Sequence, residues 1–373
     1  AYMRGTSVYL VDRVVPMLPE RLSNELCSLK PNEDKLCFSA VFQMNEKAEV
    51  LDQWFGKTII HSDRRFDYAQ VQEIIENSEG EMKDEILKLH ELSSMLRSLR
   101  FKKGAFSFER VEVKFQLDNT GKPIGVYFKE AKDSNWLIEE FMLLANKKVA
   151  EKIGKVKKGT QAKTFVYRIH DRPDPEKIMN FSNFVHRFGY SLKTGTDQAI
   201  AHSMNKLVHD IKGKNEQYIL ESLAIRTMAK AKYSGKNIGH YGLAFPYYTH
   251  FTSPIRRYPD LMVHRLLQSY LDGEKSENSR KNEMRCVHSS AREELAVQAE
   301  RASVKYKQVE FLKDHIGEEY DGIISGVNEW GFYVELTDNH CEGMVPVREL
   351  SDDFYEYDES NYCLVGARTR RRF

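Results

Sequence analysis

The chain lacks the features of a secreted, membrane-spanning or strongly basic protein. Its five cysteines are odd in number and include no Cys-x-x-Cys pair, which argues against a disulfide framework or a thiolate zinc site. No apolar run approaches the roughly 20 residues that a transmembrane helix needs. No signal peptide opens the sequence. We therefore expect a cytoplasmic protein that makes no membrane contact.

Excess charge of either sign is also missing. The formal net charge is +1, so affinity for nucleic acid would have to come from local patches. One basic segment, residues 147–163, holds seven lysines with only Glu151 against them. It is either a solvated helix end or a polyanion contact. A second basic cluster, in residues 368–372, faces an acidic segment at 352–359.

The most informative segment is residues 240–260, which is rich in aromatics and hydroxyls and contains Arg256 and Arg257. An amphipathic helix is expected directly after it, over residues 260–271. A guanidinium matches a phosphate bidentately, and a helix N-terminus also favours anions. Neighbouring aromatics can stack on bases. The segment therefore predicts a clamp for a nucleic-acid backbone, although one arginine could instead pair with Asp260.

Periodicity predicts an α+β protein whose character changes near residue 318. Strands are expected at residues 36–44, 49–60, 106–115, 125–129 and 164–169, and helices at 67–76, 82–99, 134–153 and 282–313. Asp174 followed by Pro175 is typical of a helix start. After Glu318 the apolar period becomes 2, with strands expected at 320–327, 330–336 and 343–347, which indicates a small barrel.

Several single residues have both a functional and a structural interpretation. Glu139 and Glu300 could accept hydrogen bonds from ribose hydroxyls, or could be surface carboxylates. Trp330 and Phe332 share one face of the predicted strand, where they would stack on bases or fill the barrel core. The histidines at 240, 250 and 264 lack the spacing of a zinc pair and are interpreted as packed side chains.

Six motifs, in this order along the chain, resemble the ribonuclease II and ribonuclease R family of exoribonucleases, and most closely its ribonuclease R branch. They are Arg4-Gly-Thr-Ser-Val-Tyr9, Val15-Pro-Met-Leu-Pro-Glu20, Leu22-Ser-Asn-Glu-Leu-Cys-Ser-Leu29, Glu139-Glu-Phe-Met-Leu-Leu-Ala-Asn146, Arg168-Ile-His-Asp-Arg-Pro173 and Ser253-Pro-Ile-Arg-Arg-Tyr258. The resemblance implies a ribonuclease II-type catalytic domain over residues 1–317, with a mixed sheet and surrounding helices. Residues 318–373 resemble the OB-fold RNA-binding domain named from ribosomal protein S-one.

The resemblance also implies an activity and roles for individual residues. Such enzymes hydrolyse RNA processively from its 3′ end to 5′-mononucleotides, using Mg²⁺ at a cluster of aspartates. The partner would be the 3′ end of single-stranded RNA, held by a monomer. By family motif, Arg256 would grip the phosphate near the scissile bond, and Glu139 and Glu300 would contact the terminal nucleotide. Tyr9, Tyr68 and Phe108 would line the path of the RNA.

One departure from the family pattern bears on activity. The family's aspartate motif, close to Asp-x5-Asp-x-Asp-Asp, lies upstream of Arg-Gly-Thr-Ser, which begins here at Arg4, and no such run occurs in the 373 residues. We therefore expect the chain to be part of a longer protein, with an N-terminally truncated catalytic domain and a C-terminally incomplete barrel. None of its residues is predicted to be a metal ligand, and the chain alone should be nearly inactive.

Two other functions stay open on the sequence alone. The chain could be a non-catalytic RNA-binding protein of the same fold, which lacks the aspartates altogether. A translation-associated RNA-binding protein built on the barrel would explain only residues 318–373.

Overall fold

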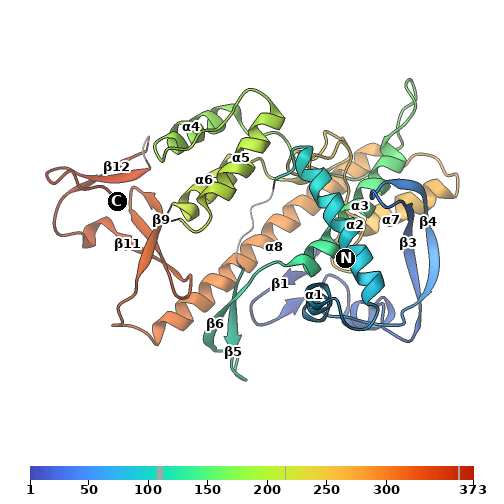
Figure 1. Cartoon of the computed structure of the whole chain (residues 1–373), viewed down its shortest axis with the longest axis horizontal. Helices are drawn as coiled ribbons and strands as arrows, with labels where there is room; N and C mark the ends of the chain where they lie inside the picture. Colours follow the sequence, from blue (N-terminus) through green and yellow to red (C-terminus); the bar gives the residue numbers. More distant parts are fainter. Residues whose placement is uncertain (107–111, 215, 360–361) are drawn as a thin grey trace. The chain divides into compact units, whose positions relative to one another are not determined.

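The computed structural model describes residues 1–106, 112–214, 216–359 and 362–373 (Figure 1). The chain divides into two compact units that are interleaved in sequence. The first comprises Ala1–Ala105, Ala131–Arg172 and Lys230–Glu300, and the second comprises Phe106–Glu130, Pro173–Ala229 and Arg301–Phe373. Within the described residues, no helix is long and apolar enough to cross a membrane.

The first unit combines short strands, one long hairpin and five helices among its described residues. The hairpin pairs β3 with β4 (Figure 1). The elements of this unit are β1 (Val8–Tyr9), β2 (Val14–Val15), η1 (Arg21–Leu26), β3 (Asp34–Met44), β4 (Val50–His61), α1 (Tyr68–Asn77), α2 (Lys83–Lys102), α3 (Asp133–Gly154), β7 (Tyr167–Ile169), β8 (Lys232–Ser234), η2 (Tyr241–Leu243), α7 (Tyr258–Leu271) and the first part of α8 (Ser279–Lys313).

Local sequence accounts for these elements. Alternation along β3 and β4 turns Phe38, Ala40, Phe42 and Phe55 toward the core, with Ala40 directly opposite Phe55. Helix α1 starts at a capping box in which Asp67 and Gln70 exchange side-chain and backbone hydrogen bonds. The strands predicted over 36–44 and 49–60 are confirmed, as are the helices predicted near α1, α2, α3, α7 and α8.

The core of the first unit lies between α3, β7, α7 and α8. Side chains with no exposed surface come from α3, α7, α8 and the residues just before β7, among them Val149, Val166, Val263, Leu267 and Cys286. Strand β7 itself contributes buried side chains that are 4% exposed. Close packing of this kind holds the loops between the elements in place, because core side chains leave little free volume.

The second unit holds a three-helix cluster and several small sheets. Asp174 caps α4 and Pro175 occupies its first turn, which confirms the predicted helix start. The elements of this unit are β5 (Glu112–Leu117), β6 (Pro123–Lys129), α4 (Pro175–His186), α5 (Asp197–Ile211), α6 (Gln217–Thr227), the end of α8, β9 (Gly322–Asn328), β10 (Gly331–Leu336), β11 (Glu342–Pro346), η3 (Val347–Glu349), β12 (Tyr355–Asp358) and β13 (Cys363–Gly366).

The described strands of the molecule form separate antiparallel sheets. Strands β9, β10 and β11 make a three-stranded sheet, and the others pair as hairpins or short ribbons. Among the described residues, β12 and β13 do not pair with that sheet to close a barrel. The strand predicted over 164–169 is shorter than expected, because only Tyr167–Ile169 pairs with β8. Part of the strand predicted over 106–115 falls outside the described residues.

One carboxylate organises the end of the chain. The buried side chain of Asp353 accepts hydrogen bonds from the Thr369 hydroxyl and from the backbone N–H groups of Phe354, Arg368 and Thr369. These bonds hold the pKa of Asp353 far below its usual value. The acidic and basic clusters seen in the sequence therefore meet through this residue, and through Asp352 with Arg371 at 3.4 Å.

Candidate functional site

The two adjacent arginines of the predicted clamp have different environments. Arg257 is largely buried, and its guanidinium donates to both carboxylate oxygens of Asp260 at 2.8 and 2.9 Å. Asp260 has no exposed surface and also accepts the backbone N–H of Ser253 at 2.7 Å. The side chain of Arg256 is exposed and has no ion pair in the part of the chain that the structure describes. Arg256 is thus presented to solvent by a loop that Arg257 and Asp260 hold in shape.

This arrangement gives Arg257 the structural pairing that the sequence left open, while its predicted contact with RNA stays a prediction. The edge of its guanidinium formed by Nε and Nη2 is occupied by Asp260, so a phosphate bound at that edge would have to displace a buried carboxylate. The structural interpretation, an arginine paired with Asp260, therefore applies to Arg257 and leaves Arg256 as the candidate phosphate ligand.

A buried asparagine on α3 fixes the middle of the same loop. We call residues 245–257 the arginine loop. The Asn146 side-chain oxygen accepts the backbone N–H groups of Phe251 and Thr252 at 2.8 and 3.2 Å, and its amide donates to the Tyr248 hydroxyl. Asn146 was part of a family motif in the sequence but was not predicted as a site residue. Its role is to tie the arginine loop to α3.

The N-terminal segment brings Tyr9, Arg256 and Glu300 together. The backbone carbonyl of Arg256 accepts hydrogen bonds from the Ser7 N–H at 2.9 Å and the Thr6 hydroxyl at 3.1 Å. Two residues further on, the Tyr9 N–H donates to the Glu300 carboxylate at 2.8 Å. The ring of Tyr9 remains about half exposed. One short N-terminal segment therefore brings the three predicted residues together, although Tyr9 and Glu300 are 291 positions apart in the sequence.

Gly5 makes this close approach possible. Its φ of +73° lies in the left-handed region, and a Cβ there would overlap the side chain of Arg292 on α8. Its carbonyl also accepts the Tyr258 N–H at 2.9 Å, at the start of α7. The glycine of the Arg-Gly-Thr-Ser motif is thus needed for both backbone conformation and packing.

Glu139 belongs to a second group of residues, which joins α2 to α3. Its carboxylate accepts a hydrogen bond from Arg100 at 3.2 Å and stays 45% exposed. Arg100 is buried and is held mainly by the neighbouring, buried Glu140. Arg97 lies 3.9 Å from Glu140 and packs its guanidinium over the Trp136 ring. Arg100 therefore fixes Glu139 in position while Glu140 balances the buried charge, a pairing that the sequence did not predict.

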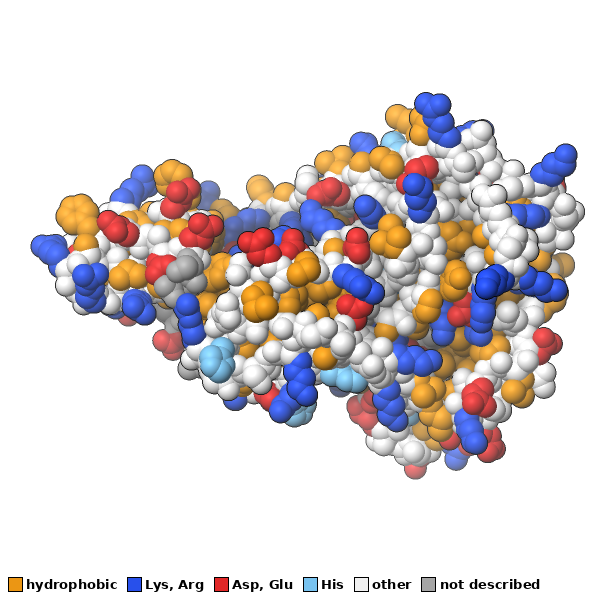
Figure 2. Space-filling model, turned by 90° about the horizontal axis from the view of Figure 1, so that it is seen from above, with side chains coloured by type: hydrophobic (Ala, Val, Ile, Leu, Met, Phe, Trp, Pro, Cys, Tyr) orange, Lys and Arg blue, Asp and Glu red, His pale blue; other side chains and the backbone are white. Residues whose placement is uncertain are grey.

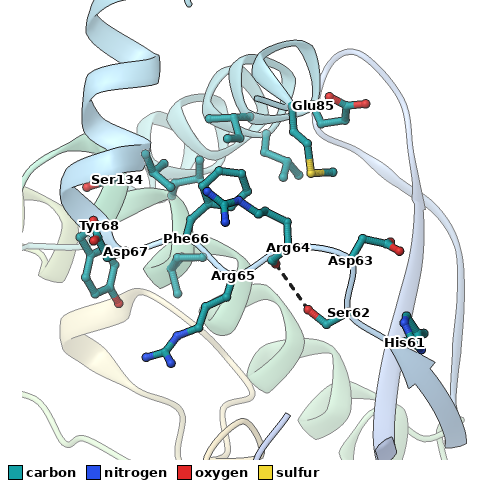
Figure 3. A pocket seen from close by; sticks show the side chains of 16 residues that line it. His61, Ser62, Asp63, Arg64, Arg65, Phe66, Asp67, Tyr68, Glu85 and Ser134 are labelled. Atoms are coloured by element: carbon teal, nitrogen blue, oxygen red, sulfur yellow. Dashed lines mark hydrogen bonds between the residues drawn. The ribbon is translucent and has the colours of Figure 1, made fainter. Parts of the chain in front are cut away.

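Tyr68 lies at the mouth of a pocket between the loop before α1 and helices α1, α2 and α3 (Figure 3). The pocket measures about 770 Å³ and has an apolar lining that includes Val71, Ile86 and Leu137. Arg65 and Tyr68 point to the same side of this loop in Figure 3. Arg64 pairs with Glu81 at 3.0 Å, whereas Arg65 is exposed and forms no ion pair among the described residues.

The remaining predicted RNA contacts fall in the barrel or outside the described residues. Phe108 is one of residues 107–111, which the structure does not describe. Trp330 is 68% exposed, whereas Phe332 is 8% exposed and stacks on Phe373 at a centroid distance of 4.9 Å. The prediction that Trp330 and Phe332 share a face is wrong, because Asn328 folds a turn that places Trp330 before β10. Phe332 packs in the hydrophobic core of the C-terminal domain, and Trp330 remains available for stacking.

The histidines of residues 240–264 are packed side chains, as the sequence predicted. His250 Nδ1 lies 2.8 Å from the Tyr233 hydroxyl, and His264 Nε2 lies 2.7 Å from the Phe251 carbonyl oxygen. Burial, with the nearby charges of His170 and Arg168, lowers the pKa of His240 to about 3. Burial also lowers the pKa of His250 well below its usual value.

These shifts predict acid sensitivity. An unfolded histidine titrates near 6.5, so the unfolded chain binds more protons than the folded chain between that pH and the folded pKa. The stability contributed by neutral His240 and His250 is complete above pH 6.5 and falls on acidification, by up to about 1.4 kcal/mol per pH unit for each residue. Urea unfolding at pH 7 and pH 5 measures this slope. H240N should reduce the loss of stability per pH unit by the amount that one proton contributes, while H202N, at an exposed histidine, should not. Equal pH dependence in H240N and the unaltered chain would refute the assignment of this effect to His240.

No described group of three or more His, Cys, Asp or Glu side chains is placed to hold a metal ion. The carboxylates near Arg256 have other partners: Asp260 binds Arg257, and Glu300 accepts from Tyr9. The described residues therefore do not fit the Mg²⁺ set that the family resemblance implies.

Comparisons with known proteins agree with this fold. The sequence model of the RNB domain matches residues 1–273, and that of the S1 RNA binding domain matches residues 313–370. The chain belongs to the RNB domain family. The S1 match confirms the OB-fold RNA-binding domain that the resemblance implied for the end of the chain.

Individual relatives share the whole length of the chain. Ribonuclease R 1 of Lactococcus lactis is 38% identical, with 100% of this chain covering 46% of the relative, and Ribonuclease R of Aquifex aeolicus is 36% identical, with 53% of the relative covered. The structure of Mycoplasma genitalium RNase R in complex with ribose methylated single-stranded RNA matches with a TM-score of 0.89 at 28% identity, covering 100% of this chain and 59% of that one. The chain spans about half the length of the curated relatives it matches.

Proposed function

We propose that this chain forms the RNA-holding part of a processive 3′-to-5′ exoribonuclease that hydrolyses single-stranded RNA to 5′-mononucleotides. The observation that carries the proposal is the exposed guanidinium of Arg256, placed on a rigid loop beside Tyr9 and Glu300 in an RNB-family chain. We further propose that the whole protein acts as a cytoplasmic monomer with Mg²⁺ as its ion.

The described residues support a division of roles. Arg256 offers two parallel N–H donors to a phosphate and would stabilise the charge that develops on it. Tyr9 presents a half-exposed ring that can pack on a nucleotide, and Tyr68 does so at the pocket mouth. The exposed carboxylate of Glu139, held by Arg100, can accept hydrogen bonds from a terminal ribose.

Binding to the terminus is the first test of this proposal. We expect the chain to bind a linear single-stranded RNA more tightly than a circular RNA of the same sequence, because only the linear molecule offers a terminal ribose and phosphate to Glu139 and Arg256. Fluorescence anisotropy with both RNAs measures the difference. Equal affinities would count against terminal recognition and favour a protein that binds RNA only along its length.

Hydrolysis by the chain alone should be absent or very slow. Metal-assisted cleavage needs carboxylates that hold the ions, and the described residues supply no such group. The check is an RNA degradation assay with Mg²⁺ that follows release of labelled mononucleotides, with an active ribonuclease of this family as positive control. Robust mononucleotide release by the 373-residue chain would show that it assembles a catalytic centre from other residues.

The alternative, a non-catalytic RNA-binding protein of the same fold, predicts the same result for the chain alone. The two differ in the longer protein to which the chain would belong. An exoribonuclease would release mononucleotides there and lose this activity on R256A, whereas a non-catalytic protein would bind RNA without shortening it.

A further inference from the structure

The C-terminal end of α3 and the loop after it carry a concentrated positive charge that the site described above does not use. Lys152, Lys155, Lys157 and Lys158 are all exposed, and we call these four residues the lysine patch. The nearby Glu151 is shared by earlier lysines, Lys147 at 3.9 Å and Lys148 at 3.5 Å. Within the described ranges, no carboxylate forms an ion pair with any of the four. A surface that is otherwise nearly neutral, with the two charge signs interspersed on the face in Figure 2, thus has a local excess of one sign.

The structure of the helix end explains only part of this charge. Cations in the last turn are favourable because they lie near the negative end of the helix dipole. That accounts for Lys152, in the last turn, and for Lys155, the C-cap residue. Lys157 and Lys158 follow the helix and lie beyond this effect. Like charges also crowd here. The pKa of Lys147 is lowered, mainly by burial, while the charge of Glu151 raises it. The charges of Lys103, Lys148 and Lys155 lower it further. Such crowding costs free energy that a polyanion would offset.

The patch is connected to the candidate site by α3 and by the arginine loop. Glu139 lies 13 residues before Lys152 on α3, which corresponds to about 20 Å at 1.5 Å per residue. The arginine loop packs against the same end of the helix: a Cβ on Gly154 would lie 2.7 Å from the Tyr247 ring, and Lys147 Nζ lies 5.1 Å from the centre of the Phe245 ring. The patch therefore adjoins the base of the loop that presents Arg256.

We propose that the lysine patch is a second contact for the phosphodiester backbone of single-stranded RNA, several nucleotides away from the terminus that Arg256 and Glu139 hold. This inference rests on the proposed function. A flexible ammonium on a long stem binds phosphates as a point charge, without reading sequence. The contact would strengthen the binding of long RNA and leave the recognition of the terminus unchanged.

The test compares the salt dependence of RNA binding in two quadruple variants of the full 373-residue chain. The first is K152Q/K155Q/K157Q/K158Q. The matched control is K30Q/K47Q/K83Q/K275Q, which removes four exposed lysines elsewhere in the first unit. Both variants alter only exposed side chains, and thermal unfolding verifies that each is folded. The probes are single-stranded RNAs of about 4 and about 16 nucleotides, linear and circular at the longer length.

The slope of log affinity against log salt should become shallower for the long RNA by up to about 3 in the patch variant, at about 0.7 for each of four lost phosphate contacts. The control variant should have the same slope as the unaltered chain with the long RNA. The patch variant should have the same slope as the unaltered chain with the short RNA. The patch variant should also keep its preference for linear RNA. If the patch variant keeps its slope while the preference for linear RNA is intact, the inference is overturned and the proposed function stands. If the unaltered chain has no preference for linear RNA, the proposed function fails, and the inference fails with it.

Discussion

Replacing Asp260 by alanine is expected to lower the free energy of unfolding by about 3–5 kcal/mol. The carboxylate has no exposed surface, and it accepts from the guanidinium of Arg257 and from the Ser253 N–H. Its removal leaves a buried positive charge and an unsatisfied backbone donor in the arginine loop. Urea unfolding at pH 7 measures the change.

A matched double variant separates the buried charge from the packing. R257M/D260M removes both charges and keeps much of the side-chain volume, so it should be more stable than D260A. It should not reach the stability of the unaltered chain, because Ser253 still lacks its acceptor. A D260A protein within about 1 kcal/mol of the unaltered chain would mean that the arginine loop does not depend on this ion pair.

The second large effect is on RNA binding. R256A should weaken binding of linear single-stranded RNA by roughly 10- to 150-fold, because one charge-assisted phosphate contact contributes about 1.5–3 kcal/mol. R256K should lie between, since lysine keeps the charge but not the paired donors. Anisotropy titrations at one salt concentration give the affinities.

Stability provides the control for this prediction. Arg256 is exposed, so R256A should unfold like the unaltered chain, whereas D260A should lose both stability and binding. R265A removes another exposed arginine, which lies on α7 rather than in the arginine loop, and this variant should bind RNA normally. If R265A and R256A weaken binding equally, the effect is one of general charge rather than of a placed ligand.

The sequence predicted elements well where local rules decide them. The start of α4 follows from Asp174 and Pro175, and the β3–β4 hairpin follows from alternating apolar residues. A small barrel was expected from the same alternation after residue 318; the S1 match bears out a domain of this type, although the described strands do not close into a barrel. The sequence did not predict that Trp330 lies outside the strand, because the turn before the strand depends on hydrogen bonds to the single Asn328 side chain.

The candidate site was predicted through motifs, and its supporting residues were not. Nothing local separates Arg256 from Arg257; the hydrogen bonds to Asp260 do. Arg100 and Glu139, which are in contact, lie 39 positions apart in the sequence, and Asn146 and Phe251 lie 105 positions apart. Such pairs depend on tertiary packing, which periodicity does not report. The roles of Tyr9, Tyr68, Glu139, Glu300 and Arg256 in RNA binding stay predictions.

We propose above that Arg256 and its neighbours hold the 3′ terminus of a single-stranded RNA. The most direct measurement is the ratio of affinities for linear and circular RNA of one sequence, for the unaltered chain and for R256A. We predict a ratio of about ten or more in favour of linear RNA and a clearly smaller ratio in R256A, because one charge-assisted contact is lost while Glu139 still meets the terminal ribose. A ratio near one in the unaltered chain, or one that R256A leaves unchanged, would contradict it.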